Sequence, residues 1–211
     1  MNRLSRLALG LTILAAWVAP VYAAGKAVPE EGAVELMLLR QQSVQKELKL
    51  TEEQVEKIHK FAHQQWEKAQ KASKGSDAEQ DKEFVKLSEE NERFVEKTLM
   101  KEQRTRLQEI NLQVAGLLCV TRHDIAKRLK LTDEQKKRLA EIQKEARREA
   151  EELLYATKKE QQREKLKEIR ELSRKRVQDL LTDEQELAWK NMTGEPFKGD
   201  LAYFNADTAG K

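Results

Sequence analysis

The chain has 211 residues, of which 36% are charged and only 5% are aromatic, and it holds 40 Lys and Arg against 37 Asp and Glu. This near balance argues against a nucleic-acid-binding protein, which needs an excess of basic residues on one face. Many charges with few Gly, Pro and aromatic residues are typical of long solvated helices, in which opposite charges pair one turn apart. We therefore expect an all-α protein rather than a compact enzyme core.

The first 23 residues have the pattern of a secretory signal peptide. Arg3 and Arg6 give a basic start, residues 7–19 are apolar, and residues 21–23 offer small side chains for cleavage. A helix needs about 20 apolar residues to span a ~30 Å hydrocarbon layer, so this apolar stretch is too short to be an anchor. We expect cleavage before Ala24, export to the periplasm or the medium, and no membrane insertion of the mature chain.

The rest of the chain contains two copies of one helical unit. The string KLTEEQ at residues 49–54 recurs as KLTDEQ at residues 130–135, an offset of 81 residues that becomes 82 after one inserted residue. Two copies of about 80 residues indicate a duplication. We place the first unit at residues 30–113 and the second at 114–193, with a loose tail at 194–211. Matched apolar pairs are Leu36 and Leu117, Leu48 and Leu129, Ile58 and Leu139, Val95 and Val177, and Leu99 and Leu181.

Each LTxxQ motif is a helix start. Thr is the N-cap and accepts a hydrogen bond from the amide of the third helical residue, and Gln at that third position reaches back to the amide of the cap. The acidic residues between them lie in the first turn, where the helix dipole favours anions. One of the four copies is degraded and has Met100 in place of Thr. The defining residues are Leu50, Thr51 and Gln54; Leu99 and Gln103; Leu131, Thr132 and Gln135; and Leu181, Thr182 and Gln185.

Further capping boxes at Ser76 and Thr157 divide each unit into an apolar lead-in helix, a long helix, a turn, a second long helix and a terminal helix. Gly75 marks the first turn, whereas nothing but the box at Thr157 marks the second, so a continuous helix is the alternative there. One apolar stripe holds Val55, Ile58, Ala62, Trp66 and Ala69, and another holds Leu166, Ile169, Leu172 or Ser173, and Val177. Both stripes are narrow, which predicts coiled-coil-like hairpins in an elongated or curved molecule. The long helices are expected at residues 52–73, 79–98, 133–155 and 158–180.

The paired motifs resemble those of the LTxxQ family of periplasmic stress proteins, the Spy/CpxP-like proteins to which ZraP is related. The motifs of the two pairs start 49 and 50 residues apart in this chain. The resemblance implies an ATP-independent periplasmic chaperone or stress-signalling inhibitor with a curved helical surface. Family members carry one motif pair per chain and dimerise, whereas this chain carries two pairs. The resemblance therefore leaves two states open, a monomer with internal pseudo-symmetry and a homodimer.

We expect a binding protein without catalytic residues or a cofactor. The sequence contains no Gly-rich phosphate loop, HExxH motif or ordered Ser/His/Asp set. The expected clients are unfolded or envelope proteins, held by apolar side chains that Lys and Arg surround. The alternative is a structural or adaptor protein that binds one fixed helical partner through the same stripes. The candidate client-binding residues are Met37, Phe61, Trp66, Phe84 and Phe94.

A metal-binding stress protein is a weaker alternative. His59 and His63 lie one turn apart on the first long helix, a spacing that can bind zinc, and Glu56 lies one turn before them. A structural zinc site needs four ligands, and no second His pair lies nearby, so we predict no metal site. The single cysteine, Cys119, lies in an apolar run and is expected to be a small buried core residue.

The apolar lead-ins, Leu36–Leu39 and Leu117–Val120, bear on how the chain assembles. If they pack against each other, the chain closes on itself; if they face outward, two chains pair. A covalently linked second unit has a high effective concentration, about millimolar for a short connector, so it can replace a separate subunit. The connector, residues 111–124, is mostly apolar, and we expect a single chain with internal pseudo-symmetry.

Overall fold

The computed structural model describes residues 31–156 and 159–201, and the regular secondary structure of this part of the chain is all helix, which confirms the predicted all-α fold. None of its helices is both long and apolar enough to cross a bilayer. The helices are α3 (Glu31–Leu39), α4 (Gln42–Glu47), α5 (Glu52–Ala72), α6 (Asp77–Thr98), α7 (Lys101–Ala115), the 3₁₀ helix η1 (Gly116–Thr121), α8 (His123–Arg128), α9 (Asp133–Ala156), α10 (Lys159–Gln178) and α11 (Asp183–Thr193).

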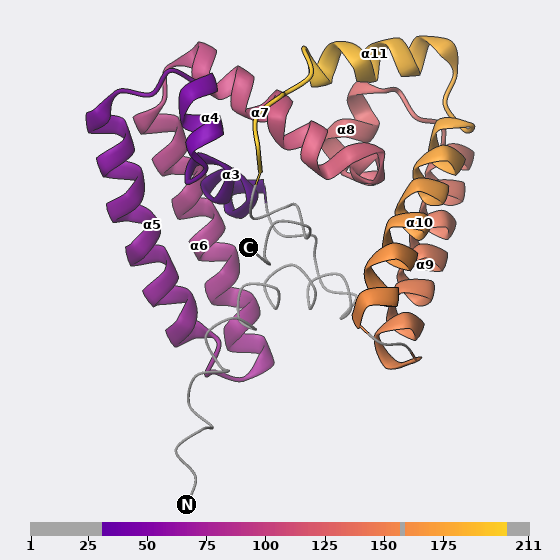
Figure 1. Ribbon diagram of the computed structural model, residues 1–211, viewed down its shortest axis with the longest axis horizontal. Helices are drawn as coiled ribbons and strands as arrows, with labels where there is room; N and C mark the ends of the chain where they lie inside the picture. Colours follow the sequence, from indigo (N-terminus) through magenta and orange to yellow (C-terminus); the bar gives the residue numbers. More distant parts are fainter. Residues whose placement is uncertain (1–30, 157–158, 202–211) are drawn as a thin grey trace, which may run out of the picture.

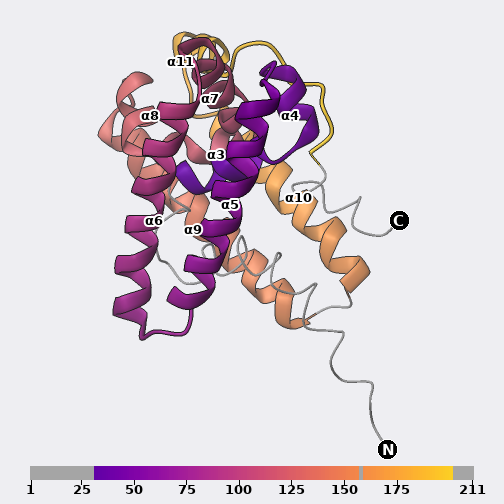
Figure 2. The same ribbon diagram turned by 90° about the vertical axis from the view of Figure 1, so that its left-hand side faces the viewer.

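Two helical hairpins form the sides of an arch, and α7, α8 and α11 form its top (Figure 1). In the first hairpin α5 packs along α6, and in the second α9 packs along α10. α7 leaves the first hairpin and runs along the top, where α11 packs against it. After a turn of 90° the second hairpin is seen to be inclined to the first (Figure 2). A single chain therefore supplies both sides of a curved helical molecule.

Capping chemistry sets where the long helices begin. α5 begins at Glu52 and α9 at Asp133, directly after their Thr caps, as predicted. α6 begins at Asp77, two residues before the predicted start, because Ser76 is the cap and its box with Glu79 starts the helix at the next residue. The predicted break at Thr157 lies outside the described residues.

Each unit has its own hydrophobic core, and each lead-in packs into the core of its own unit. Leu38 and Leu39 of α3 are fully buried in the first core with Ile58 and Val95. Leu117, Cys119 and Val120 of η1 are buried in the second core with Leu139 and Val177. Burying one such aliphatic side chain stabilises the fold by roughly 1.5–3 kcal/mol. The lead-ins therefore stabilise their units and leave the question of dimerisation open.

The second lead-in is not the α-helix that the repeat predicts. α7 ends at Ala115, past the predicted unit boundary at residues 113 and 114, and Gly116 is its C-cap. Gly116 has a φ of +64°, in the left-handed region that glycine adopts without strain. The chain then continues as the short 3₁₀ helix η1. The two units are thus joined by the turn at Gly116, where α7 is followed directly by η1.

The buried face of α5 differs slightly from the predicted stripe. Ile58, Ala62 and Ala69 are buried as predicted, but the fourth buried residue is Gln65. The buried positions 58, 62, 65 and 69 have the spacing of a coiled-coil seam. The predicted stripe differs from this seam at one position, where it has Trp66 in place of Gln65. Trp66 is 46% exposed as a result. On α10 the seam takes Ser173, and the neighbouring Leu172 is 56% exposed.

The segment after α11 is not a loose tail over its whole length. α11 ends at Thr193, and Gly194 has a φ of +62°. Residues 194–201, which we call the strap, then return to the first unit, where Phe197 and Leu201 pack against the first core. The prediction of a loose tail was wrong for the strap, because the Gly and Pro residues that end the helix do not prevent these two apolar side chains from packing.

Candidate functional site

The LTxxQ motifs of each unit meet in a reciprocal pair of glutamines, which we call a clasp. In the second unit Gln135 Nε2 donates to Gln185 Oε1 at 2.7 Å, and Gln185 Nε2 donates to Gln135 Oε1 at 3.0 Å. Each Oε1 also accepts from the amide of its own Thr cap, Thr132 or Thr182, at 3.0 Å. Gln135 Nε2 donates in addition to the carbonyl of Leu180 at 2.9 Å. Each glutamine therefore caps the start of its own helix and also binds the glutamine at the start of the other helix.

The first unit contains the same clasp although one Thr is missing. Gln54 Nε2 donates to Gln103 Oε1 at 2.9 Å, and Gln103 Nε2 donates back to Gln54 Oε1 at 3.2 Å. The amide of Met100 still donates to Gln103 Oε1 at 2.9 Å. Met100 has no hydroxyl to accept a hydrogen bond from the Gln103 amide, so half of this capping box is lost.

The clasp explains the spacing of the motifs. One motif starts the first helix of a hairpin and the other starts the terminal helix that follows the hairpin, so the two helix starts meet only after the chain has gone out and back. The side-chain amides of the two glutamines hold the two helix starts together through hydrogen bonds between partly buried groups. These groups carry no nucleophile or general base, so the clasp positions helices rather than performing chemistry.

Two of the predicted client-binding residues stack on each other. The rings of Phe61 on α5 and Phe94 on α6 are nearly parallel, with an interplanar angle of 3° and centroids 3.9 Å apart. Both are partly buried, and so are Met37 and Phe84. Phe94 also packs against the first core. The Phe61–Phe94 stack joins α5 to α6, and all four residues leave only part of their surface available for a client.

Among the described residues of the hairpins, the most exposed large apolar side chains lie elsewhere. They are Trp66 on α5, Val85 on α6 and Leu172 on α10, each between 46% and 56% exposed. Only Trp66 is among the predicted residues. Sequence reasoning missed Leu172 because the periodicity of α10 allowed either Leu172 or Ser173 to face inward.

Ion pairs link the two helices of each hairpin. In the first, Glu90 accepts hydrogen bonds from Lys68 and from Gln65, and these lower the pKa of its carboxyl group, with the Lys68 bond the larger cause. In the second, Arg176 donates to Glu145 at 2.6 Å and lowers the pKa of that carboxyl. The hairpins therefore have the charged surface that the composition predicts, with apolar side chains exposed at single positions.

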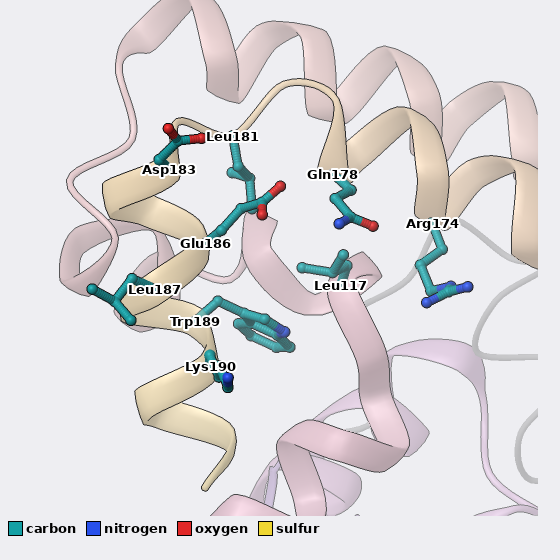
Figure 3. A pocket seen from close by; sticks show the side chains of 9 residues that line it. All are labelled: Leu117, Arg174, Gln178, Leu181, Asp183, Glu186, Leu187, Trp189 and Lys190. Carbon is teal, nitrogen blue, oxygen red and sulfur yellow. The ribbon is translucent and has the colours of Figure 1, made fainter.

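A shallow depression of about 530 Å³ lies where α10 meets α11. In Figure 3 the indole of Trp189 lies beside Leu117, and Gln178 and Arg174 extend toward the depression from α10. Glu186 extends toward it from α11, while Leu187 points away from the other side chains. The lining mixes both charges with a few apolar groups and therefore lacks a set of groups that converge on one small ligand.

The predicted weak metal candidates do not converge with further ligands in the described ranges, where no group of three or more His, Cys, Asp or Glu is close enough to hold a metal ion. His59 and His63 are exposed on α5, and His63 Nδ1 lies 3.8 Å from Glu67 Oε1. Cys119 is buried in the second core, as predicted.

Comparison of the chain with protein-family models, with curated proteins and with solved structures gave no match. The resemblance to the LTxxQ family thus rests on the motifs themselves, on their spacing and on their recurrence.

Proposed function

We propose that this chain is an exported, ATP-independent, non-enzymatic binding protein of the Spy and CpxP kind, which holds unfolded or envelope proteins. The observation that supports the proposal is the duplicated clasp. Both motif pairs make the same glutamine contact at the same point of a hairpin, so the recurrence of LTxxQ has one structural reason in both units. One chain then supplies two hairpins, where the resemblance implies a dimer with one pair per subunit.

The hairpins offer the kind of surface that such a function needs. Trp66, Val85 and Leu172 are exposed at separate points among charged residues. Scattered apolar contacts of this sort suit weak binding of many chains, whereas a fixed partner is usually held by a contiguous, well-packed apolar patch.

Suppression of aggregation tests the proposal. The mature protein, from Ala24 onward, is added at near-stoichiometric ratio and without ATP to two unrelated aggregating proteins. We expect suppression with both, and we expect Trp66→Gln combined with Leu172→Gln to lose most of it. Gln64→Ala, at an exposed position on the same helix as Trp66, is the control. Suppression of neither protein would reject the proposal and favour the adaptor that binds a single helical partner.

Export is tested separately. When the full chain is expressed with its own leader, we expect recovery from the periplasm or the medium with an N-terminus near Ala24. An intact chain that begins at Met1 and stays in the membrane fraction would contradict this part of the proposal.

A further inference from the structure

The strap is held by the first unit in an unusual way, mainly through its backbone. Gln113 Nε2 donates to the carbonyls of Thr193 at 2.6 Å and Glu195 at 2.8 Å, and Gln113 Oε1 accepts from the amide of Phe197 at 2.7 Å. One side-chain amide thus satisfies two backbone groups of the strap and the carbonyl of Thr193, the last residue of α11.

Two further side chains of the first unit bind the strap backbone. Arg106 Nη1 donates to the Glu195 carbonyl at 2.8 Å, and Glu47 and Glu109 hold the same guanidinium in place at 2.7 Å each. The Ser43 hydroxyl donates to the Asp200 carbonyl. At the positions that the repeat matches to Ser43, Arg106 and Gln113, the chain has Asp124, Ala188 and Glu195, the last of which belongs to the strap itself. The strap-binding groups therefore belong to the first unit alone.

Side chains of the strap contribute at two points. Phe197 and Leu201, four residues apart, pack against the first core and are both partly buried. Gly199 between them has no room for a side chain, since an added Cβ would lie 2.3 Å from the Phe197 ring and 2.7 Å from Ser43 Cβ. Lys198 and Asp200 are exposed.

Main-chain hydrogen bonds that give affinity, combined with pockets for alternate side chains that give specificity, are one of the recurring modes by which proteins bind extended peptide segments. We propose that the surface formed by α4 and α7 at Ser43, Arg106 and Gln113 is a peptide-binding site, which the strap occupies within its own chain. Its ligands are peptide segments that carry an aromatic residue, a small residue two positions later and an aliphatic residue four positions later. This inference is independent of the proposed function, because it concerns one defined site and is measured without a client protein.

The strap can leave this site. Several of its hydrogen bonds lie at the surface, and it is anchored by two partly buried side chains near the end of the described chain. Segments with few buried contacts open at low free energy, well before the fold as a whole. A peptide from another protein then competes with the strap for the same groups.

The test uses a dye-labelled peptide of residues 193–201 and the full mature chain, with binding followed by fluorescence anisotropy. Phe197→Ala removes the main anchor of the strap, and Gly199→Ala forces the Phe197 ring away from its place. If the strap occupies its site nine-tenths of the time, both variants bind the peptide about tenfold more tightly than the wild type. Lys198→Ala, at an exposed position in the strap, is the matched control and should bind as the wild type does.

Two further measurements fix the site and the specificity. Adding Gln113→Ala to Phe197→Ala should reduce peptide binding about tenfold, because the Thr193 carbonyl and the Phe197 amide lose their partner and the Glu195 carbonyl keeps only Arg106. A peptide with Phe197→Ala should not bind. Circular dichroism checks that the variants keep their helices, since Phe197 and Gly199 lie outside every helix. Equal binding to all the chains, including none to any of them, or undiminished binding of the altered peptide would overturn the proposal.

Discussion

The two units make the same clasp from unequal parts. The second unit has Thr132 and Thr182 as caps, and their hydroxyls accept hydrogen bonds from the backbone amides of Gln135 and Gln185. The first unit has Thr51 and Met100, and only Thr51 can do so. The glutamine pair nevertheless forms in both, at 2.7–3.2 Å. The pair of glutamine side chains is therefore the constant part of the LTxxQ junction, and a Thr cap adds to it without being required.

The units also differ in what covers them. The first is covered by the nine-residue helix α3, whereas the short η1 covers the second. At the corner between the last two helices, Arg104 of the first unit donates to the carbonyls of Glu96 and Leu99. The matched residue in the second unit is Glu186, which cannot donate, and the depression of Figure 3 lies at this corner. The first unit is therefore the more completely closed of the two.

The largest effect is expected from the cores, which should be equivalent. Ile58 and Leu139 are matched residues with no exposed surface. We expect Ile58→Ala and Leu139→Ala each to lower the free energy of unfolding by about 3 kcal/mol, because each leaves a cavity. Urea denaturation measures this, and Leu187→Ala, at a residue that is 60% exposed, is the control. If the two losses differed by more than about 1.5 kcal/mol, half of the expected cost of each, the cores would not be equivalent.

The clasps come next, and here too we expect similar costs. Gln54→Ala and Gln135→Ala should each lower the free energy of unfolding by about 2 kcal/mol, since each leaves partly buried backbone groups unpaired. A double-mutant cycle that combines Gln135→Ala with Gln185→Ala should give a coupling energy above about 0.5 kcal/mol. Gln64→Ala controls for helix propensity. Additive losses in the cycle would show that the amides act only as separate caps.

The caps should show the difference between the units. Thr132→Ala should lower the free energy of unfolding by about 1 kcal/mol, the usual cost of losing an N-cap. Met100→Thr should be neutral or stabilising, because it restores the missing hydroxyl at a position that is 64% exposed. Urea melts that gave the opposite order would contradict the assignment of Thr as the cap.

The smallest effect concerns pH. The Glu90 carboxyl has a pKa below its ordinary value of 4.5, caused first by its hydrogen bond with Lys68. The folded chain therefore binds fewer protons here than the unfolded chain, so this contribution is present above pH 4.5 and is lost as the pH falls through the lowered pKa. Glu90→Gln should flatten this part of a stability profile recorded from pH 7 to pH 3. An unchanged slope would show that the pair contributes nothing.

Sequence reasoning predicted the helices well because their signals are local. A Thr or Ser cap with Gln or Glu three residues later fixes a helix start within a few residues of chain, and Gly75 marks a turn in the same way. The all-α fold follows from these signals together with the composition. α10 shows the limit of such reasoning, since its periodicity did not decide between Leu172 and Ser173.

The clasps and the strap could not be predicted by the same means. Each glutamine already has a local role as a cap, so nothing in its motif requires a partner 49 or 50 residues away. The nearly equal separation of the two pairs was the signal that could have indicated a contact. The strap contact depends on Gln113 and Arg106, which look like ordinary polar residues on the exposed face of a helix. Their role exists only after the chain has returned to them.

Because both units lie in one chain, a substitution can change one unit without changing the other. In an assembly of identical subunits, every substitution appears in all copies, so a change that suits one position must be tolerated at its symmetric counterpart. Here Met100 occurs once, and Thr182 at the matched position is unaffected. The strap site is likewise present in a single copy. Covalent fusion thus permits a substitution to specialise one half while the other half stays unchanged.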